Sequence, residues 1–264
     1  MPLKFVAPHS RFEEIFGLPK ALADEASLGV SAKGLRMILI DDARVRVVKF
    51  SASPSAFGLY EFSPPTMEEE VYGINLEKIA AFIKNTKKVA ESAQVEMTLP
   101  SQPGQMVLKC GRVKLVLALL ANVKAPKDVP PIEKTIPYLA TCVIRGKDFK
   151  AFSEAASTLA DSSGTVSVDL LVKDGKLTAV SQGNVDRAEI EVGPASPYLK
   201  EDGTKADPEG AHSTFSVDLL VAVCNALPAR EITFKLANDA PLVAQYSDDG
   251  VDVFAMLAPR VGEG

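Results

Sequence analysis

The chain has 264 residues, of which 47% are hydrophobic and 24% are charged, and its formal net charge is -5. This composition predicts a soluble protein with enough apolar residues for one large or two medium domains. No apolar run approaches the roughly 18 residues that a membrane-spanning helix needs, so we expect no membrane partner. The opening segment MPLKFVAPHS lacks the apolar stretch and cleavage site of a signal peptide, which predicts an intracellular protein.

The first part of the chain predicts few helices and many strands. The segment SRFEEIFGLPKALAD, residues 10–24, is amphipathic, but Gly17 and Pro19 are expected to break its helix. The strand-like runs that follow mostly show the near-alternation of a half-buried sheet. They are LGVSA, GLRMILI, VRVVKF, QVEMTL, MVLKC and VKLVLALL.

The segment NLEKIAAFIKNTKK, residues 75–88, predicts a helix with two unlike faces, because it carries four lysines and one glutamate within an acidic chain. At about 100° per residue, an apolar arc and a lysine arc fall on opposite sides. The apolar arc consists of Leu76, Ile79, Ala80 and Ile83, and the lysine arc of Lys78, Lys84 and Lys88. A solvated helix face is the alternative interpretation.

The run VKLVLALL, residues 113–120, has a single charge and would be adhesive if it lay open at the edge of a sheet. We expect a matching strand of another subunit to cover it by backbone pairing, and head-to-tail pairing of unlike edges closes a ring when the rotation permits. The alternative is a strand inside the sheet, because strand order is hard to predict from sequence.

Residues 122–136 are expected to form an extended connector. Their prolines, Pro126, Pro130 and Pro131, disfavour a helix and remove donors that a central strand would need. Beyond the connector, KDFKAFSEAASTLAD at 147–161 predicts a helix whose outward side carries Lys147 and Lys150. The segment SVDLLVAVCNALP predicts a further helix that has no lysine, and residues 194–212 are expected to form a long mobile surface loop.

The chain also repeats itself. ALAD at 21–24 matches TLAD at 158–161, and LALLA at 117–121 matches FAMLA at 254–258, so both pairs are 137 residues apart. Between them INLEKI at 74–79 matches FSVDLL, and AKGL matches KDGKL at 173–177, in the same order and at similar spacing. This order and spacing predict two copies of one unit, each with the same sequence of strands and helices.

Little in the chain suggests catalysis. Cys110, Cys142 and Cys224 are well separated in apolar surroundings, which is typical of buried thiols and not of a metal site. His9 and His212 both lie in loop-like sequence and are expected to be solvated.

No phosphate-binding loop, dinucleotide fingerprint or paired-cysteine motif occurs, so we expect no cofactor and no metal. The adjacent carboxylates Asp41 and Asp42 fit a turn between strands. A small-molecule enzyme that uses this pair is retained as a minor alternative, because no other acid, base or ligand accompanies it.

If two such units repeat around a ring with their helices inward, a weakly basic bore lies inside an acidic shell. Such a bore suits duplex DNA, because attraction to phosphates needs no base reading and can be weak when the ring itself retains the DNA. An acidic exterior would also discourage DNA from binding outside the hole.

Five segments in a common order make the chain resemble the PCNA-type DNA sliding clamps of archaea and eukaryotes, the proliferating cell nuclear antigen family. They are GLRMILIDDARVRVVKF at 34–50, FGLYEF at 57–62, YGINLEKIAAFIK at 72–84, NDAPLVAQY at 238–246 and MLAPRV at 256–261. The resemblance covers essentially the whole chain.

The resemblance implies an α+β DNA-clamp fold with two similar domains, 1–121 and 137–264, joined by the 122–136 connector. In each domain helices would cover one face of curved antiparallel sheets, and three subunits would close a ring around duplex DNA. The implied protein is not an enzyme but a polymerase processivity factor. The DNA-facing residues would be Lys20, Lys78, Lys84, Lys88, Lys147 and Lys150.

The resemblance also implies partners, which are other clamp subunits in a homo- or heterotrimer, DNA polymerase, a clamp loader, flap endonuclease and DNA ligase. These enzymes would bind through a short peptide with a glutamine, an aliphatic residue and two aromatics. Its pocket would consist of Ile40, Arg44, Val129, Ile132, Pro241, Met256, Leu257 and Pro259, with Arg44 where the family usually has histidine. The subunit contact would consist of Arg112, Lys114, Val116 and Ala118 with Lys176, Thr178 and Val180.

An archaeal member would be cytoplasmic and associated with the nucleoid, and a eukaryotic member nuclear. Within the same fold, the alternative function is a specialised or checkpoint-type clamp subunit of a heterotrimeric ring.

Overall fold

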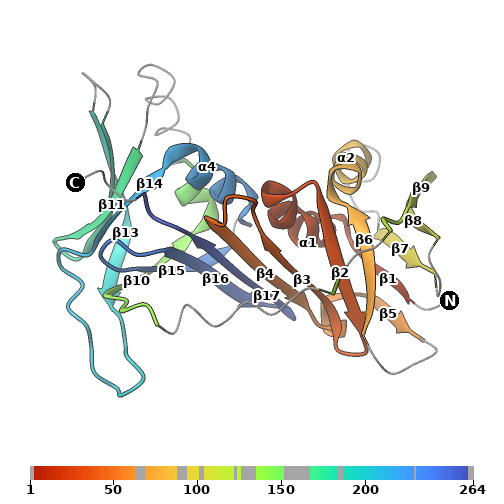
Figure 1. Cartoon of the computed structure of the whole chain (residues 1–264), viewed down its shortest axis with the longest axis horizontal. Coiled ribbons are helices and arrows are strands. Elements are labelled where there is room, and N and C mark those ends of the chain that lie inside the picture. Colours follow the sequence, from red (N-terminus) through yellow and green to blue (C-terminus); the bar gives the residue numbers. More distant parts are fainter. Residues whose placement is uncertain are drawn as a thin grey trace. The chain divides into compact units, whose positions relative to one another are not determined.

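The computed structural model describes residues 3–63, 69–87, 94–100, 104–121, 124–125, 135–151, 167–182, 187–228 and 230–260. The chain forms two compact units (Figure 1). Unit 1 comprises Met1–Asp41, Val48–Asp128 and Ser247–Val253, and unit 2 comprises Asp42–Val47, Val129–Tyr246 and Phe254–Gly264. The predicted connector is described only at 124–125 and 135–136, so its course and the domain boundaries stay predictions.

Unit 1 alternates strands with two α-helices. Its elements in chain order are β1 (Leu3–Pro8), α1 (His9–Leu22), β2 (Glu25–Ser31), β3 (Gly34–Ile40), β4 (Arg46–Ala52), the 3-10 turn η1 (Pro54–Ala56), β5 (Leu59–Phe62), β6 (Glu70–Asn75), α2 (Leu76–Thr86), β7 (Gln94–Leu99), β8 (Gln105–Cys110) and β9 (Val113–Ala118). One antiparallel sheet has the order β5-β1-β7-β8-β9. In a second sheet β4, β3, β2 and β6 follow one another.

The core of unit 1 follows from the alternation in its strands. In β1, for example, Leu3, Phe5 and Ala7 are buried while the residues between them are more exposed. Helices α1 and α2 pack against each other and lie on the same side of the sheet strands (Figure 1). The ring of Phe5 stacks on Phe12 of α1 at 5.3 Å between centroids, so the helix and the sheet share one apolar core.

Unit 2 repeats this order of elements. It contains β10 (Ala140–Arg145), helical residues at 146–151, β11 (Ser167–Lys173), β12 (Lys176–Gln182), β13 (Arg187–Pro197), β14 (His212–Ser216), α4 (Val217–Ala226), β15 (Glu231–Leu236), β16 (Leu242–Asp248) and β17 (Val251–Leu257). The strands β14, β11, β12, β13, β10, β15 and β16 follow one another in the sheet.

The predicted internal repeat is confirmed at the level of these elements. Helices α2 and α4 begin at Leu76 and Val217, directly after Asn75 and Ser216, within the two matched segments of sequence. The α+β fold class is confirmed as well, since strands dominate both units and helices are few.

The prediction that Gly17 and Pro19 break the first helix is wrong. Helix α1 is continuous from His9 to Leu22, with Pro19 inside it. Pro19 has no backbone N–H and therefore removes one helical hydrogen bond, but its own carbonyl oxygen still accepts one from Ala23 N at 3.1 Å. The buried Phe12, together with the other apolar residues on its side of α1, holds the helix on the core.

The prediction that both histidines are solvated is wrong for His9. This side chain is 8% exposed, and its Nε2 lies 2.6 Å from the carbonyl oxygen of Ile83 in α2. It therefore joins the two helices of unit 1 by a buried hydrogen bond. His212 is half-exposed, as expected of a solvated residue, and its Nε2 lies 3.3 Å from the carboxylate of Asp169.

Residues 194–212 do not form the predicted structureless loop, since their first four residues belong to β13 and the last begins β14. An antiparallel bridge joins Leu199 and Lys205. The Glu209 carboxylate accepts a hydrogen bond from Gly175 N at 2.7 Å, which ties the segment to the β11–β12 turn. The segment is mostly exposed, as a surface loop should be, and local hydrogen bonds order parts of it.

Candidate functional site

The lysine face of α2 is set by how this helix is capped and buried. The Asn75 side chain accepts a hydrogen bond from Lys78 N at 2.8 Å, which caps the first turn. The buried residues are Leu76, Ile79, Phe82, Ile83 and Thr86. This apolar stripe contains Phe82, which the sequence interpretation left out, and it leaves the predicted lysines on the opposite side.

Lys78 and Lys84 are both exposed on α2, six residues apart. Neither side chain forms an ion pair with another described residue. Both charges are therefore available to a partner outside the chain.

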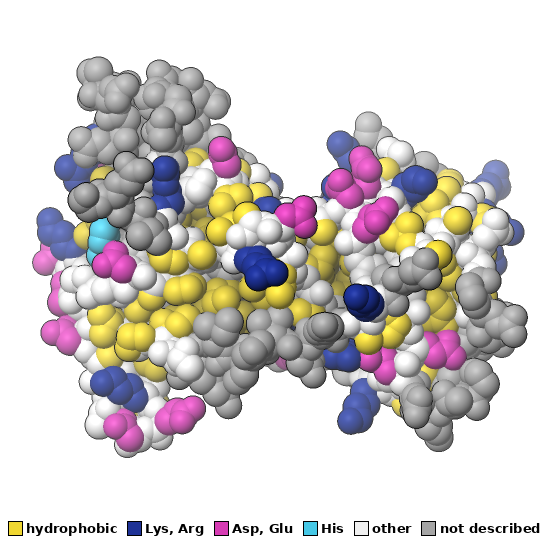
Figure 2. Space-filling view, in the orientation of Figure 1, with side chains coloured by type: hydrophobic (Ala, Val, Ile, Leu, Met, Phe, Trp, Pro, Cys, Tyr) yellow, Lys and Arg dark blue, Asp and Glu magenta, His cyan; other side chains and the backbone are white. Residues whose placement is uncertain are grey.

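The other predicted DNA-facing lysines differ from these two. Lys20 forms an ion pair with Asp24, which lies just beyond the end of α1, so the charge of Lys20 is partly neutralised. Lys147 and Lys150 are exposed on the helical residues 146–151. Lys88 lies outside the described residues. On the face drawn in Figure 2, basic and acidic side chains are interspersed, so any attraction to DNA on this face is weak.

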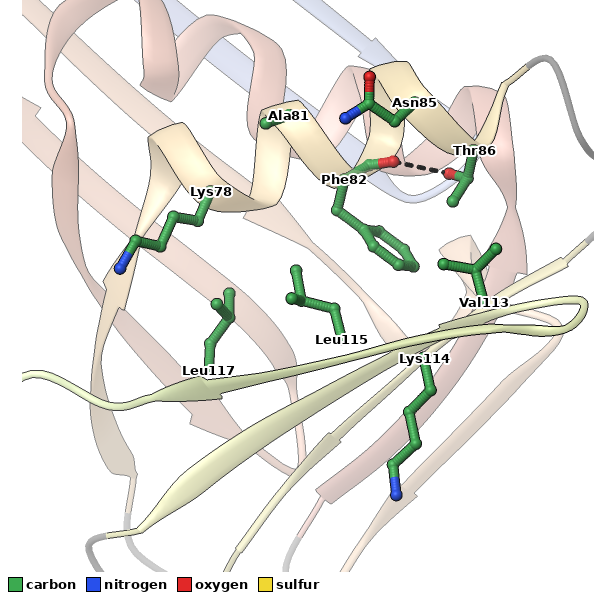
Figure 3. A pocket seen from close by; sticks show the side chains of 9 residues that line it. All are labelled: Lys78, Ala81, Phe82, Asn85, Thr86, Val113, Lys114, Leu115 and Leu117. Carbon is green, nitrogen blue, oxygen red and sulfur yellow. Dashed lines mark hydrogen bonds between the residues drawn. The ribbon is translucent and has the colours of Figure 1, made fainter.

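A pocket of about 440 Å³ opens between α2 and β9 within unit 1. Figure 3 shows Phe82 pointing down from α2 toward Val113, Leu115 and Leu117, which point up from β9. The Lys114 side chain points to the opposite side of the strand. The apolar side of β9 thus faces an open, largely apolar pocket instead of a filled core.

The strand β9 lies at the end of its sheet, as the prediction of an open edge required. The predicted contact residues on it, Arg112, Lys114, Val116 and Ala118, are all exposed. An exposed edge with unpaired backbone groups is a template for pairing with another strand.

Lys114 has no acidic partner among the described residues, although acidic charge lies nearby on the same sheet face. Its cross-strand neighbour is Lys109, which pairs with Glu96 at 3.2 Å. Glu96 also binds Lys4 at 3.0 Å, and this hydrogen bond, together with that from Lys109, holds the pKa of the Glu96 carboxyl below its usual value. The row of charges across the sheet therefore ends at an unpaired cation on its edge.

The prediction that Lys176, Thr178 and Val180 form the second contact edge is wrong. Their strand, β12, pairs with β11 on one side and with β13 on the other, so its backbone groups are already used. Thr178 and Val180 are each only 8% exposed. The candidate edge lies one strand further along the sheet, in β13.

The first half of β13 has a neighbour on one side only within the described part of the chain. Arg187–Val192 pairs with β12, whereas β10 pairs with β13 only from Ala195 onward. On this half Glu189 and Glu191 are exposed, and they alternate with the partly buried Ile190. Both glutamates already form ion pairs, Glu189 with Arg187 and Glu191 with Lys176, each at 2.8 Å. The edge of β13 therefore presents exposed carboxylates that are partly neutralised, whereas Lys114 on the edge of β9 has no acidic partner among the described residues.

A third candidate surface is an apolar cluster in unit 2. Its buried members are Tyr138, Ala237, Ala240 and Val243, and the partly buried Ile136, Tyr198, Phe254 and Met256 pack against them. The rings of Tyr138 and Tyr198 lie 5.4 Å apart, and Lys235 Nζ lies over both at 5.7 and 5.6 Å.

The cluster contains only part of the predicted client-peptide pocket. Met256 belongs to it, whereas Leu257 is 2% exposed and, next to Met256 in the strand, points to the other side of it. Pro241 directly follows Ala240 of the cluster, and Pro259 is partly exposed. Val129 and Ile132 lie outside the described residues.

Ile40 ends β3 of unit 1 and is 48% exposed, which is unusual for a large apolar side chain in this chain.

The sequence interpretation missed Tyr138 and Tyr198, which come together from distant segments. The only sequence signal for them was a tyrosine within polar or proline-rich surroundings, in TIPYLA and ASPYLK.

Arg44 is exposed and adopts a left-handed backbone with φ 56°. The next residue, Val45, accepts a hydrogen bond from Ala258 N at 2.7 Å, so Arg44 is tied to the segment that follows Met256.

No group of three or more His, Cys, Asp or Glu side chains in the described part of the chain is arranged to hold a metal ion. No helix among the described residues is long and apolar enough to cross a membrane.

Comparison with characterised proteins gives full-length matches, although no family model matches the chain. The chain is 26% identical over 273 residues to the DNA polymerase sliding clamp of Pyrococcus abyssi, covering 100% of both chains. It is 24% identical over 245 residues to the DNA polymerase sliding clamp of Methanococcoides burtonii, covering 91% of both.

Solved structures agree with these matches in fold. A structure of the C-terminal region of FEN-1 bound to A. fulgidus PCNA matches with a TM-score of 0.76 at 20% identity, over 99% of this chain and 100% of the other. The PCNA of Entamoeba histolytica matches with a TM-score of 0.78 at 14% identity, over 99% and 100% of the two chains. The chain is thus similar in sequence, over its full length, to DNA polymerase sliding clamps, and similar in fold to PCNA structures.

Proposed function

We propose that this protein is a DNA sliding clamp, a polymerase processivity factor that encircles duplex DNA and tethers other enzymes to it. The observation that carries the proposal is the full-length relation to sliding clamps, which extends over both of the repeated units. A clamp of this kind performs no chemistry on a substrate, so the protein acts by binding alone.

The proposed DNA contact is weak and independent of sequence. Lys78 and Lys84 on α2 offer unpaired charges, and Lys147 and Lys150 offer exposed ones, while Lys20 contributes less because Asp24 neutralises part of its charge. Such contacts attract phosphates without reading bases. The closed ring around the duplex would keep the protein on DNA, which so few lysine contacts could not do alone.

The proposed ring closes head to tail, with β9 of one subunit pairing with the first half of β13 in the next. Lys114 on the first edge would meet Glu189 or Glu191 on the second, and the apolar pocket beside β9 would receive the partly buried side of β13, which includes Ile190. Unlike edges that match in this way form a heterologous contact, which closes when the rotation permits.

A clamp subunit of a mixed ring is the second candidate. Because the basic edge and the acidic edge both occur on this chain, copies of the chain itself are suitable neighbours for one another, which favours a homotrimer. A mixed ring would need no such match within a single chain.

The proposed client site is the apolar cluster around Tyr138 and Met256, with Arg44 beside it. Aromatic anchors of a short peptide gain from a dry apolar surface with polar groups at its margin. DNA polymerase, a clamp loader, flap endonuclease and DNA ligase are the proposed clients. The FEN-1 peptide in the A. fulgidus PCNA structure is a precedent in a relative of the same fold.

The compartment follows from this role. In an archaeon the protein would work in the cytoplasm at the nucleoid, and in a eukaryote it would work in the nucleus.

The test is primer extension by a polymerase that carries an intact client peptide, with a clamp loader and a trap that limits each polymerase to one binding event. We expect the protein to lengthen the product of a single binding event, and a Met256→Asp variant to lose this effect while still assembling. Product lengths that do not change with the protein, although it assembles and binds client peptide, would refute the proposal.

A further inference from the structure

Arg44 is next in the chain to a backbone hydrogen bond that leads to the apolar cluster of unit 2. It directly precedes Val45, whose carbonyl oxygen accepts the hydrogen bond from Ala258 N at 2.7 Å. Met256, two residues before Ala258, packs against the cluster. The backbone at Arg44 is therefore held, through Val45, to the strand that contributes Met256 to the cluster.

The backbone at Arg44 is in a costly conformation. Its φ of 56° lies in the left-handed region, where a residue other than glycine loses about 1 to 3 kcal/mol and persists only when its surroundings enforce it. The other non-glycine residues with positive φ are all aspartates, which tolerate this region better. Arg44 follows the turn residues 42–43 between β3 and β4, a position where a left-handed residue is common, and the connection holds the arginine in one backbone conformation.

The charge of Arg44 is not used within the described part of the chain. No ion pair or side-chain hydrogen bond joins it to another described residue, and the exposed Asp42 two positions earlier is not its partner. A guanidinium stays protonated at all relevant pH values and binds a carboxylate with two parallel hydrogen bonds. A single cation beside an apolar surface suits one carboxylate, whereas DNA phosphates call for several cations together.

We propose that Arg44 is a specificity-determining residue that selects client peptides carrying an acidic side chain next to their aromatic anchors. This inference rests on the proposed client site and adds to it which peptides bind best. Since the pair would be solvent-exposed, we expect a preference of about two- to five-fold, corresponding to the usual strength of a surface ion pair.

The experiment uses two labelled peptides, each with a glutamine, an aliphatic residue and two aromatics. One carries Asp and the other Lys at the positions that flank the aromatic pair. Affinities for the whole protein and for Arg44→Glu are measured by fluorescence anisotropy, and assembly is checked by light scattering. The matched control is Lys173→Glu, since Lys173 is also exposed and without an ion pair in the described part of unit 2.

We expect Arg44→Glu to shift the ratio of the two affinities toward the Lys peptide by about four-fold or more, because it replaces attraction by repulsion. Lys173→Glu should leave the ratio unchanged, and high salt should shrink the preference. An unchanged ratio in Arg44→Glu, with both peptides still bound, overturns the role of Arg44 alone. Failure of both peptides to bind the native protein overturns the client site as well. An unchanged ratio together with weaker DNA retention assigns Arg44 to phosphate contact instead.

Discussion

Reversing charge on the two proposed contact edges should separate ring assembly from folding. The perturbations are Lys114→Glu on β9 and the pair Glu189→Lys with Glu191→Lys on β13. Each variant alone places like charges across the contact, whereas the combined variant restores opposite charges in reversed order. All three residues are exposed, so the fold of each unit should be unaffected.

The expected loss of trimer stability follows from how exposed the paired side chains are. The side chains of Glu189 and Glu191 are 49% and 57% exposed and already pair with Arg187 and Lys176, so each new pair is weakened by solvent and by competition. An exposed pair contributes about 0.2–1 kcal/mol. In a ring with three identical contacts these energies add, so each single-edge variant should lower the constant for trimer formation by about 3- to 150-fold.

The assay is light scattering after size-exclusion chromatography over a dilution series, with Lys33→Glu as the control. Lys33 is an exposed lysine of unit 1 in the β2–β3 turn, remote in sequence from both edges. We expect each single-edge variant to dissociate at higher concentration than the native protein, and the combined variant to regain part of the loss. Purely additive losses in the combined variant would refute the pairing of β9 with β13.

Three further outcomes are expected. Replacing both Lys78 and Lys84 by alanine should reduce the salt dependence of DNA binding. The slope of log K against log salt should fall by about 0.9 for each phosphate that is no longer neutralised, while light scattering still shows the trimer. An unchanged slope would exclude these lysines from the DNA contact. Phe12→Ala should lower the free energy of unfolding, measured by urea titration, by about 3–5 kcal/mol, because the Phe12 side chain is fully buried against Phe5. A loss under about 1 kcal/mol would mean that α1 is not part of the core. Burial raises the pKa of the Cys142 thiol to about 12. Iodoacetamide should therefore modify this residue at pH 8 only after the protein unfolds. Rapid labelling of the native protein would contradict the burial of Cys142.

The features predicted well from sequence are those that short segments determine. Helix α2 was predicted because its apolar residues recur at helical spacing, and the structure adds the cap at Asn75. In this case local preference and tertiary packing agree.

The features that were missed depend on contacts between distant segments. Burial of α1 on the sheet outweighs Pro19, and His9 is buried because Ile83 of α2 offers it a carbonyl oxygen. The second contact edge was placed on β12 because it was carried over from the family resemblance, and the sequence does not reveal which strand has two neighbours. The apolar cluster likewise requires Tyr138 and Tyr198 to meet, and no local pattern predicts that meeting.

The central claim is that encirclement, and not tight contact, holds this protein on DNA. The most direct measurement loads the protein onto nicked circular DNA with a clamp loader, and then follows how much stays bound after a restriction enzyme opens the circle. We expect stable retention on the circle, loss from the linear product, and recovery of retention when both ends are blocked by bound protein. Equal retention on circular and freely ended DNA would contradict the account, because direct contacts would then be sufficient to hold the protein in place.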